Sequence, residues 1–263
     1  MADVFRGVWV VAYRELLRFI QERSRLFSSF AMPLIFLVIF GAGFGEIIGS
    51  MTAGVDYMQF MYPGILAMTV LMSSVMSGVS IVWDREFGFL KEILVSPLGR
   101  GGIIMGKAAG GAIVAVLQAL VMLILAPILG VSISFIMVLE LMLLIVVVSV
   151  SLSGMGLLVA SRMKSQQGFQ VVIQLIIMPL IFLAGVFYPV NNVPVWMEVI
   201  SKVNPLTYGV DAIRQVFLGS EGAATIGVTV FGHTMTVLED ILIVAALGII
   251  LLALSAWSFS RQE

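Results

Sequence analysis

The sequence predicts an all-α polytopic membrane protein with six transmembrane helices. Of its 263 residues, 60% are hydrophobic and 11% are charged, whereas soluble domains carry about 25% charged residues. Six apolar runs reach the length of about 20 residues that a helix needs to cross the hydrocarbon of a bilayer. Basic residues are also distributed unequally among the segments between these runs. We therefore treat residues 1–263 as a single transmembrane domain.

The predicted spans cover residues 28–48, 58–83, 102–129, 135–160, 169–188 and 239–259. An even number of spans leaves both termini on one side of the membrane. Twelve of the 14 lysines and arginines fall on that side, and only Lys202 and Arg214 fall on the other. Because basic segments are retained in the cytoplasm, we predict a multi-pass protein of a prokaryotic inner membrane with cytoplasmic termini.

The composition excludes several kinds of site. The chain has no cysteine and one histidine, His233, so neither a disulfide framework nor a Cys/His metal cluster is available. The formal net charge of −1 excludes a polybasic nucleic-acid-binding protein. We therefore expect no metal, no cofactor and no nucleic acid to be bound by this chain.

Residues 1–25 are predicted to form an amphipathic helix that lies on the cytoplasmic membrane surface. Its apolar face carries Phe5, Trp9, Tyr13, Leu16 and Ile20, and its charged face carries Arg14, Arg18, Glu22 and Arg25. The alternative is an ordinary basic flank that only orients the first span.

The inner segment between the second and third spans, "DREFGFLKEILVSPLGR" at 84–100, is predicted to be a short cytoplasmic helix. Its apolar residues repeat at helical spacing: Trp83, Phe87, Leu90 and Leu94. A Ser-Pro pair followed by Gly99 ends the helix. Its mixture of acidic, basic and aromatic side chains suits the docking of a soluble partner. The alternative is a loop that lies on the membrane surface.

The start of the third span, "GRGGIIMGKA" at 99–108, has the glycine and lysine spacing of a phosphate-binding loop. Such a loop also needs a preceding strand and a Ser or Thr after the lysine. Here Ala108 follows Lys107, so we predict no nucleotide binding. Gly102, Gly106 and Gly110 instead predict a smooth stripe that another helix can approach closely. Lys107 is predicted to be a cytoplasmic anchor whose stem snorkels to the membrane surface.

The outer segment that follows the fifth span, residues 189–218, is too apolar for a solvated loop and too interrupted for a span. Pro189, Pro194 and Pro205 divide it into two helical pieces, at 195–203 and 206–218. We interpret both pieces as half-helices that dip into the outer leaflet. Asp211 and Arg214 are three residues apart and can form a local pair.

Polar side chains inside the predicted spans are candidates for lining a transport path. They comprise Ser73 and Ser77 in the second span, Gln118 in the third, and Gln167, Gln170 and Gln174 in the fifth. The alternative for each is an ordinary hydrogen bond between helices. A path with so few charges suits an amphipathic, lipid-like or drug-like cargo.

Three segments carry a resemblance to a known family: "YRELLRFIQERSRLFSSFAMPLIF" (13–36), "WDREFGFLKEILVSPLGRGGIIMGKAAGG" (83–111) and "NPLTYGVDAIRQVF" (204–217). Together they resemble the membrane subunit of ABC-2 type exporters, and within that group the daunorubicin-resistance and nodulation-factor exporter permeases. The resemblance spans nearly the whole chain. Its most specific element is the charged helix with its Ser-Pro-x-x-Arg tail.

This resemblance implies a division of labour between chains. ATP and Mg²⁺ would be bound by separate cytoplasmic ATPase subunits, two per complex, and this non-catalytic permease would pair with a second permease copy, identical or not, within the membrane lipid. The residues at or near the ATPase contact would be Arg14, Glu15, Arg18, Asp84, Arg85, Glu86, Phe87, Phe89 and Lys91. The first, second and fifth spans would line the path. The outer gate would include Tyr188, Pro189, Asn204, Pro205 and Tyr208.

Two other classes of protein fit the sequence less well. An ion-coupled secondary transporter is expected to carry ionisable residues at mid-membrane and an internal repeat, and no acidic residue falls near the centre of a predicted span. An intramembrane enzyme needs a nucleophile with a positioned base, and the lone histidine falls in an outer loop.

Overall fold

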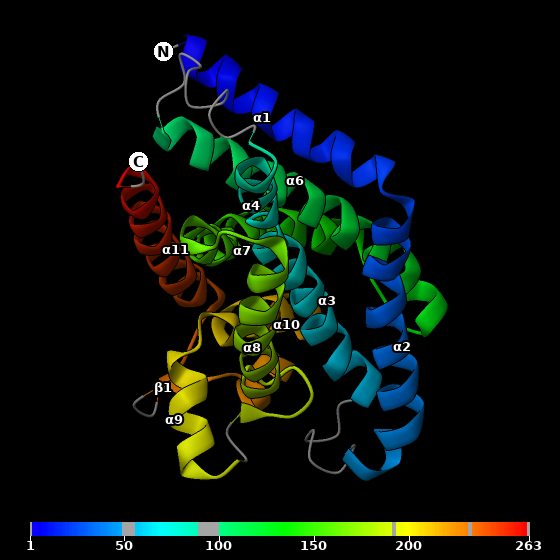
Figure 1. The fold of residues 1–263 in the computed structure, drawn as a ribbon. Coiled ribbons are helices and arrows are strands. Elements are labelled where there is room, and N and C mark those ends of the chain that lie inside the picture. Colours follow the sequence, from blue (N-terminus) through cyan, green and yellow to red (C-terminus); the bar gives the residue numbers. More distant parts are fainter. Residues whose placement is uncertain (1, 49–55, 89–99, 191–192, 231–232, 262–263) are drawn as a thin grey trace.

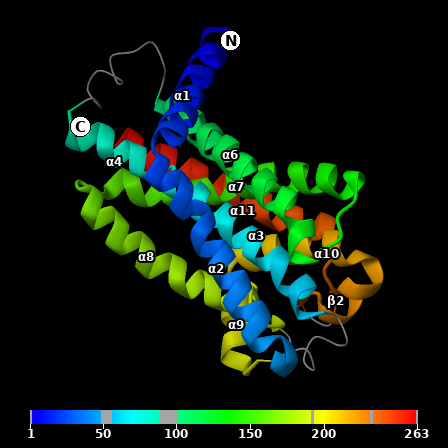
Figure 2. The same ribbon diagram turned by 90° about the vertical axis from the view of Figure 1, so that its right-hand side faces the viewer.

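The chain forms a helical bundle in this computed structural model, which describes residues 2–48, 56–88, 100–190, 193–230 and 233–261 (Figure 1). Both described ends of the chain lie at the same end of the bundle (Figures 1 and 2). The elements, in order, are α1 (Ala2–Gln21), α2 (Arg23–Ile48), α3 (Tyr57–Met76), α4 (Val79–Glu86), α6 (Arg100–Leu125), η2 (Ala126–Leu129), α7 (Phe135–Arg162), α8 (Gln166–Leu183), α9 (Val195–Val203), α10 (Pro205–Ile226), β1 (Thr229–Val230), β2 (His233–Thr234) and α11 (Val237–Ser260).

Five helical segments of the described chain are long and apolar enough to cross a membrane: Tyr57–Glu86, Gly101–Leu129, Phe135–Arg162, Gln166–Leu183 and Val237–Ser260. The number reaches six only if the bent pair of Arg6–Gln21 and Leu26–Gly41, whose helices meet at 72°, is counted as one span. The mostly helical, multi-pass prediction is therefore confirmed. A short antiparallel hairpin, β1 with β2, was not predicted, so the chain is not purely α-helical.

The centre of the bundle is α3, which α4 continues after a break at Ser77 and Gly78. Side chains from Phe60 to Leu71 are buried without interruption. The joint segment has 30 residues, which corresponds to about 45 Å of helix against about 30 Å of hydrocarbon. At least one end of this segment therefore projects beyond the hydrocarbon. Helix α4 lies at the same end of the bundle as α1 (Figure 1).

The N-terminal helix α1 lies along α6 (Figure 1). A Cβ atom built on Gly106 would come within 2.8 Å of Val11, and one on Gly110 within 2.7 Å of Glu15. The predicted close approach at this glycine stripe is confirmed, and the approaching helix is α1. The aromatic face of α1 remains exposed, with Trp9 58% and Tyr13 50% accessible.

The proline-bounded helices after α8 are confirmed. Helix α9 covers the predicted residues, and α10 begins one residue earlier than predicted, at Pro205. Non-helical Gly219, with a φ of +69°, breaks α10 just past the predicted end at Leu218. Helix α10 is buried from Leu206 to Arg214 and packs on α3, α7 and α11, whereas α9 exposes Trp196 and Val199.

The crossing of the central helix with α7 depends on two glycines. A Cβ atom on Gly156 would lie 2.0 Å from the Val75 carbonyl oxygen, and one on Gly78 would lie 2.4 Å from the Gly156 carbonyl oxygen. Any side chain there has to push two backbones apart. Small residues at such crossings allow membrane helices to pack closely.

We predict that Gly156→Val lowers the melting temperature of the detergent-solubilised protein, because overpacking a tight contact costs about 1–3 kcal/mol or more. Gly101→Ala serves as the matched control, since a Cβ atom at Gly101 meets nothing within 4 Å. Equal melting temperatures for the two variants would contradict this packing.

Candidate functional site

A buried carboxylate, Asp84, lies at the end of α4 and binds two other helices. Its side chain is 1% exposed. Oxygen Oδ2 accepts a hydrogen bond from Lys107 Nζ of α6 at 2.7 Å. Oxygen Oδ1 accepts from Arg14 and, at 3.5 Å, from Arg18, both on α1. One side chain thus joins α1, α4 and α6.

Lys107 is not a snorkelling anchor, and that prediction is wrong. Its side chain is 3% exposed, and its ammonium group donates to Asp84, to Ser80 Oγ at 2.8 Å and to Glu15 Oε1 at 3.2 Å. These three acceptors use all three of its hydrogens. A buried lysine is tolerated here because it is fully paired.

The next two residues bind two further helices. Arg85 donates to the Met163 carbonyl and, at 3.2 Å, to the Ser161 carbonyl, at the C-terminus of α7. Glu86 Oε2 accepts from the backbone N–H of Gln166 at 3.0 Å, at the N-terminus of α8. Each charge meets the helix end of opposite partial charge. We call Asp84, Arg85 and Glu86 the junction triplet, because it holds α1, α6, α7 and α8 together.

The predicted helix over 84–100 is wrong in its first part. Residues 84–86 are the last turn of α4, Phe87 is its C-cap, and Gly88 takes a φ of +81° that ends the helix. Asp84 is buried in the bundle instead of facing a partner. Phe87 is 67% exposed and contacts Trp83 edge-on. The predicted contact residues Phe89 and Lys91 lie outside the described residues.

Two adjoining pockets bring together four of the six predicted path residues. A slot of about 310 Å³ between α2, α3 and α8 is lined by Gln170 and Gln174. A pocket of about 290 Å³ between α1, α2, α3 and α6 is lined by Ser73 and Gln118. The two share Met32, Met72 and Met76, and α2 and α8 flank α3 on one face (Figure 2). We call the combined space the methionine groove.

Buried polar atoms without partners occur at this groove. Within the described chain, Ser73 Oγ and Gln118 Oε1 are buried and make no hydrogen bond. An interhelical hydrogen bond therefore does not explain either atom. Ser77 is also buried and unpartnered at Oγ, but it packs against Gly111 and lines neither pocket. Gln167, the second residue of α8, is exposed and lines neither pocket.

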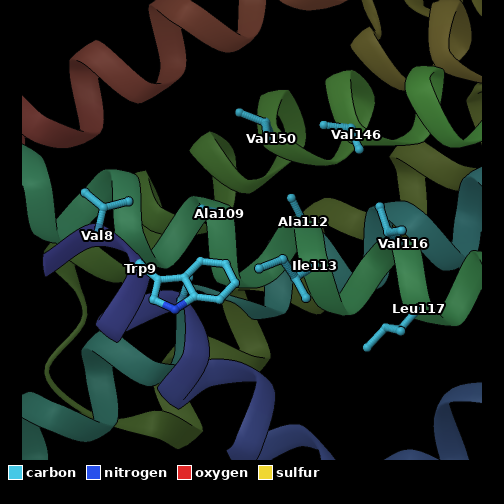
Figure 3. Close-up of a pocket in the computed structure, with 10 residues that line it drawn as sticks. Val8, Trp9, Ala109, Ala112, Ile113, Val116, Leu117, Val146 and Val150 are labelled. Carbon is cyan, nitrogen blue, oxygen red and sulfur yellow. The ribbon is translucent and has the colours of Figure 1, made fainter. Parts of the chain in front are cut away.

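A third hollow, of about 460 Å³, lies between α1, α6 and α7 (Figure 3). In Figure 3, the Trp9 ring lies beside Ala109 and Ile113 of α6. Val146 and Val150 of α7 lie on the opposite side of the hollow. All of its lining residues are apolar. The indole N–H of Trp9 is the one hydrogen-bonding group among these lining side chains, so the hollow suits hydrocarbon chains of the surrounding lipid better than a polar cargo.

The predicted gate residues cap the end of α8. The last carbonyls of a helix lack partners within it. Here Leu180 accepts from Asn204 Nδ2 at 2.7 Å, Phe182 from the Tyr188 hydroxyl, and Leu183 from Ser201. Asn204 Oδ1 also accepts from Leu206 N at 3.0 Å, at the start of α10.

Of the remaining gate residues, Pro205 opens α10 and Pro189 is buried. The Tyr208 hydroxyl donates to the Lys202 carbonyl at 2.6 Å, which ties α10 to α9. The structure therefore brings these residues together as one connection between α8, α9 and α10.

The predicted local pair of Asp211 and Arg214 is not a hydrogen-bonded ion pair, although the two charges interact electrostatically; each side chain makes other hydrogen bonds. Arg214 donates to the Gly185 carbonyl at 2.7 Å and to the Phe60 carbonyl at 3.3 Å, and its guanidinium lies 3.9 Å from the centre of the Phe60 ring. Asp211 accepts from Val228 N and from Gln215.

These features define a multi-pass helical membrane protein with a partly polar groove between its spans, the architecture of a transport protein. The family model of the ABC-2 type transporter matches residues 6–218. The chain belongs to this family.

Three relatives show the extent of the similarity. "Putative transport permease ycf38" of Cyanophora paradoxa is 30% identical over 76% of this chain and 71% of its own length. "Probable multidrug ABC transporter permease YbhR" of Escherichia coli K12 is 35% identical over 62% of this chain, but the match spans only 45% of that protein. "Nodulation protein J" of Rhizobium leguminosarum bv. trifolii is 27% identical over 74% of this chain and 75% of its own length.

We predict that Asp84→Ala destabilises the fold by about 3–5 kcal/mol, because it leaves Lys107 buried without its closest partner. Adding Lys107→Met removes the stranded charge, so the double variant is expected to recover much of the loss. Unfolding in detergent, arranged as a double-mutant cycle, measures the coupling. Additive losses would show that the two residues do not interact.

Proposed function

We propose that this chain is the permease subunit of an ATP-driven ABC exporter. It would have cytoplasmic termini in a prokaryotic inner membrane and pair with a second permease copy and two separate cytoplasmic ATPase subunits. ATP and Mg²⁺ would be bound by those ATPases and by no site on this chain. Membership of the ABC-2 type transporter family supports this assignment.

The observation that carries the proposal is the junction triplet. A force applied below the membrane can change transport only if it acts differently on the two states of the pore. Helix α4 ends at Phe87 and Gly88. The junction triplet, which immediately precedes them in the chain, contacts four other helices. A push at this point would therefore reach α1, α6, α7 and α8 together. Phe87 and Glu86 would face the ATPase, whereas Asp84 and Arg85 would pass on its movement.

The methionine groove is the proposed binding surface for cargo. Helices α2, α3 and α8, the first, second and fifth spans, line it together with α1 and α6, and Met32 and Met72 are exposed in the single chain. Methionine side chains adapt to differently shaped apolar groups, while Gln118, Ser73 and the α8 glutamines offer hydrogen bonds. This combination suits an amphipathic, lipid-like or drug-like molecule without a strong charge.

The outer gate would be the connection between α8, α9 and α10. Its helices are joined in part by side-chain hydrogen bonds to carbonyls, such as that of Asn204 to Leu180. Such contacts can exchange for water or for cargo at little cost in apolar burial. The exposed face of α9 would lie in the outer leaflet.

We predict that Phe87→Ala leaves the protein folded in the membrane but weakens its complex with the ATPase, since truncating an exposed aromatic anchor costs about 2 kcal/mol or more. Transport should fall while the ATPase remains active alone. Phe135→Ala, which removes a similarly exposed aromatic ring at the start of α7, is the matched control. Unchanged transport in Phe87→Ala would overturn the assignment of the contact.

We predict that Gln118→Leu retains or raises the melting temperature, because the side chain loses a buried oxygen that has no partner. Cargo-stimulated ATPase activity of the reconstituted complex should fall. A loss of stability with normal cargo stimulation would instead assign Gln118 to helix packing.

A further inference from the structure

Two buried carboxyl groups meet where α10 contacts α11. Asp211 is 1% exposed and Asp240 is fully buried. The Gln215 side-chain nitrogen lies 3.0 Å from Asp211 Oδ2 and 3.0 Å from Asp240 Oδ2. The two carboxylate oxygens are therefore within about 6 Å of each other. Asp240 lies beyond residue 218, where the family match ends.

Hydrogen-bond donors are too few for two ionised carboxylates. The Gln215 amide has two hydrogens but three acceptors, because the Met235 carbonyl lies 3.1 Å from the same nitrogen. Val228 N supplies one more donor, to Asp211 Oδ2 at 3.0 Å. The second oxygens, Asp211 Oδ1 and Asp240 Oδ1, are buried and have no partner in the described chain. Burying acceptor oxygens without donors costs free energy. Two ionised carboxylates would therefore be one hydrogen-bond donor short, and a proton on one of them would supply it.

The charges are also unbalanced. Arg214, 3% exposed, is the buried cation on the same helix, and one guanidinium cannot neutralise two carboxylates. An unpaired buried charge costs several kcal/mol, and a carboxyl group in that position takes up a proton instead.

Neighbouring titratable groups among the residues that the structure describes do not supply the missing positive charge. On α11, Glu239 pairs with exposed His233 of β2 at 3.2 Å. On α9, Lys202 pairs with Glu198 at 2.5 Å, and the Tyr208 hydroxyl of α10 donates to a carbonyl. Glu140 of α7, which lines a separate pocket beside Ile241, adds a further negative charge.

We propose that Asp211 and Asp240 share one proton at neutral pH and thus form a proton-binding site that fastens α10 to α11. The proton on one carboxyl group would donate to the other, as expected for two carboxyl groups that cannot both ionise at close range. Its release would leave two buried negative charges that repel and separate the helices. If α10 belongs to the outer gate, proton release would loosen that gate; this consequence rests on the proposed function, whereas the proton site does not.

Infrared spectroscopy of the purified full-length chain in lipid nanodiscs tests the site without ATPase or cargo. At neutral pH the wild type should show the C=O stretch of a protonated carboxyl group, sensitive to heavy water and lost at alkaline pH. Asp211→Asn and Asp240→Asn should each abolish it, because the remaining carboxylate is then balanced by Arg214 and receives an amide donor. Glu198→Gln, which removes a half-buried acid on α9 that is paired with Lys202, should leave it unchanged.

A wild type without this band at neutral pH would overturn the proposal, and so would a band that survives in either single variant, since burial alone would then explain it. If one variant does not fold, the other still tests whether the band belongs to the pair, and absence of the band in the wild type overturns the proposal without either. Stability gives a second measure. Folding favours the protonated pair, so the melting temperature should fall as the pH rises through its titration, and this fall should be absent in a folded Asp240→Asn variant. Equal pH dependence in the two would contradict the shared proton.

Discussion

The fold depends on one buried carboxylate at the end of its central helix. Asp84 is paired with Lys107 and with two arginines of α1, and the energetics of such pairs are particular. Forming a buried ion pair gives little net stability, because desolvation offsets the attraction, whereas breaking one leaves a stranded charge. We therefore infer that the pairing selects one arrangement of α1, α4 and α6 over others of similar apolar burial.

The two residues after Asp84 also join helices through polar contacts. Arg85 meets the carbonyls that end α7, and Glu86 meets the amide that begins α8. At the other end of α8, side chains of Ser201 and Asn204 satisfy the final carbonyls. Helix α8 is thus held by polar contacts at both ends, with the methionine groove along its side. Movement of this helix would change the groove and also the packing of its buried residues Phe169, Ile173, Ile177 and Ile181 in the apolar core.

Features encoded by neighbouring residues could be predicted from the sequence. The prolines at 194 and 205 fix where α9 and α10 begin, because proline acts on its own backbone, and these boundaries agree with the structure. The glycine stripe at Gly106 and Gly110 predicts a close helix because a missing side chain is visible in the sequence. Which helix fills it could not be predicted, since α1 is about 95 residues away.

Long-range pairing explains the errors. The local sequence around Asp84 is typical of a solvated helix face, and that around Lys107 is typical of a membrane anchor. Both side chains are buried because they pair with residues 23 to 92 positions away. Glu15 and both arginines were predicted near the ATPase contact, but the pairing of the arginines with Asp84 and of Glu15 with Lys107 follows only from the fold. The sequence offers no local signal for Asp240, whose partner Gln215 lies 25 residues away.

The most direct test of the central claim is a distance between α1 and α8. The chain has no cysteine, so single cysteines at exposed Tyr13 and Val171 can carry spin labels for pulsed electron paramagnetic resonance. If Asp84 and its neighbours join these helices, the purified chain should give one narrow distance, and adding Asp84→Ala should broaden it. An equally narrow distribution after the substitution, or a broad one before it, would contradict the account.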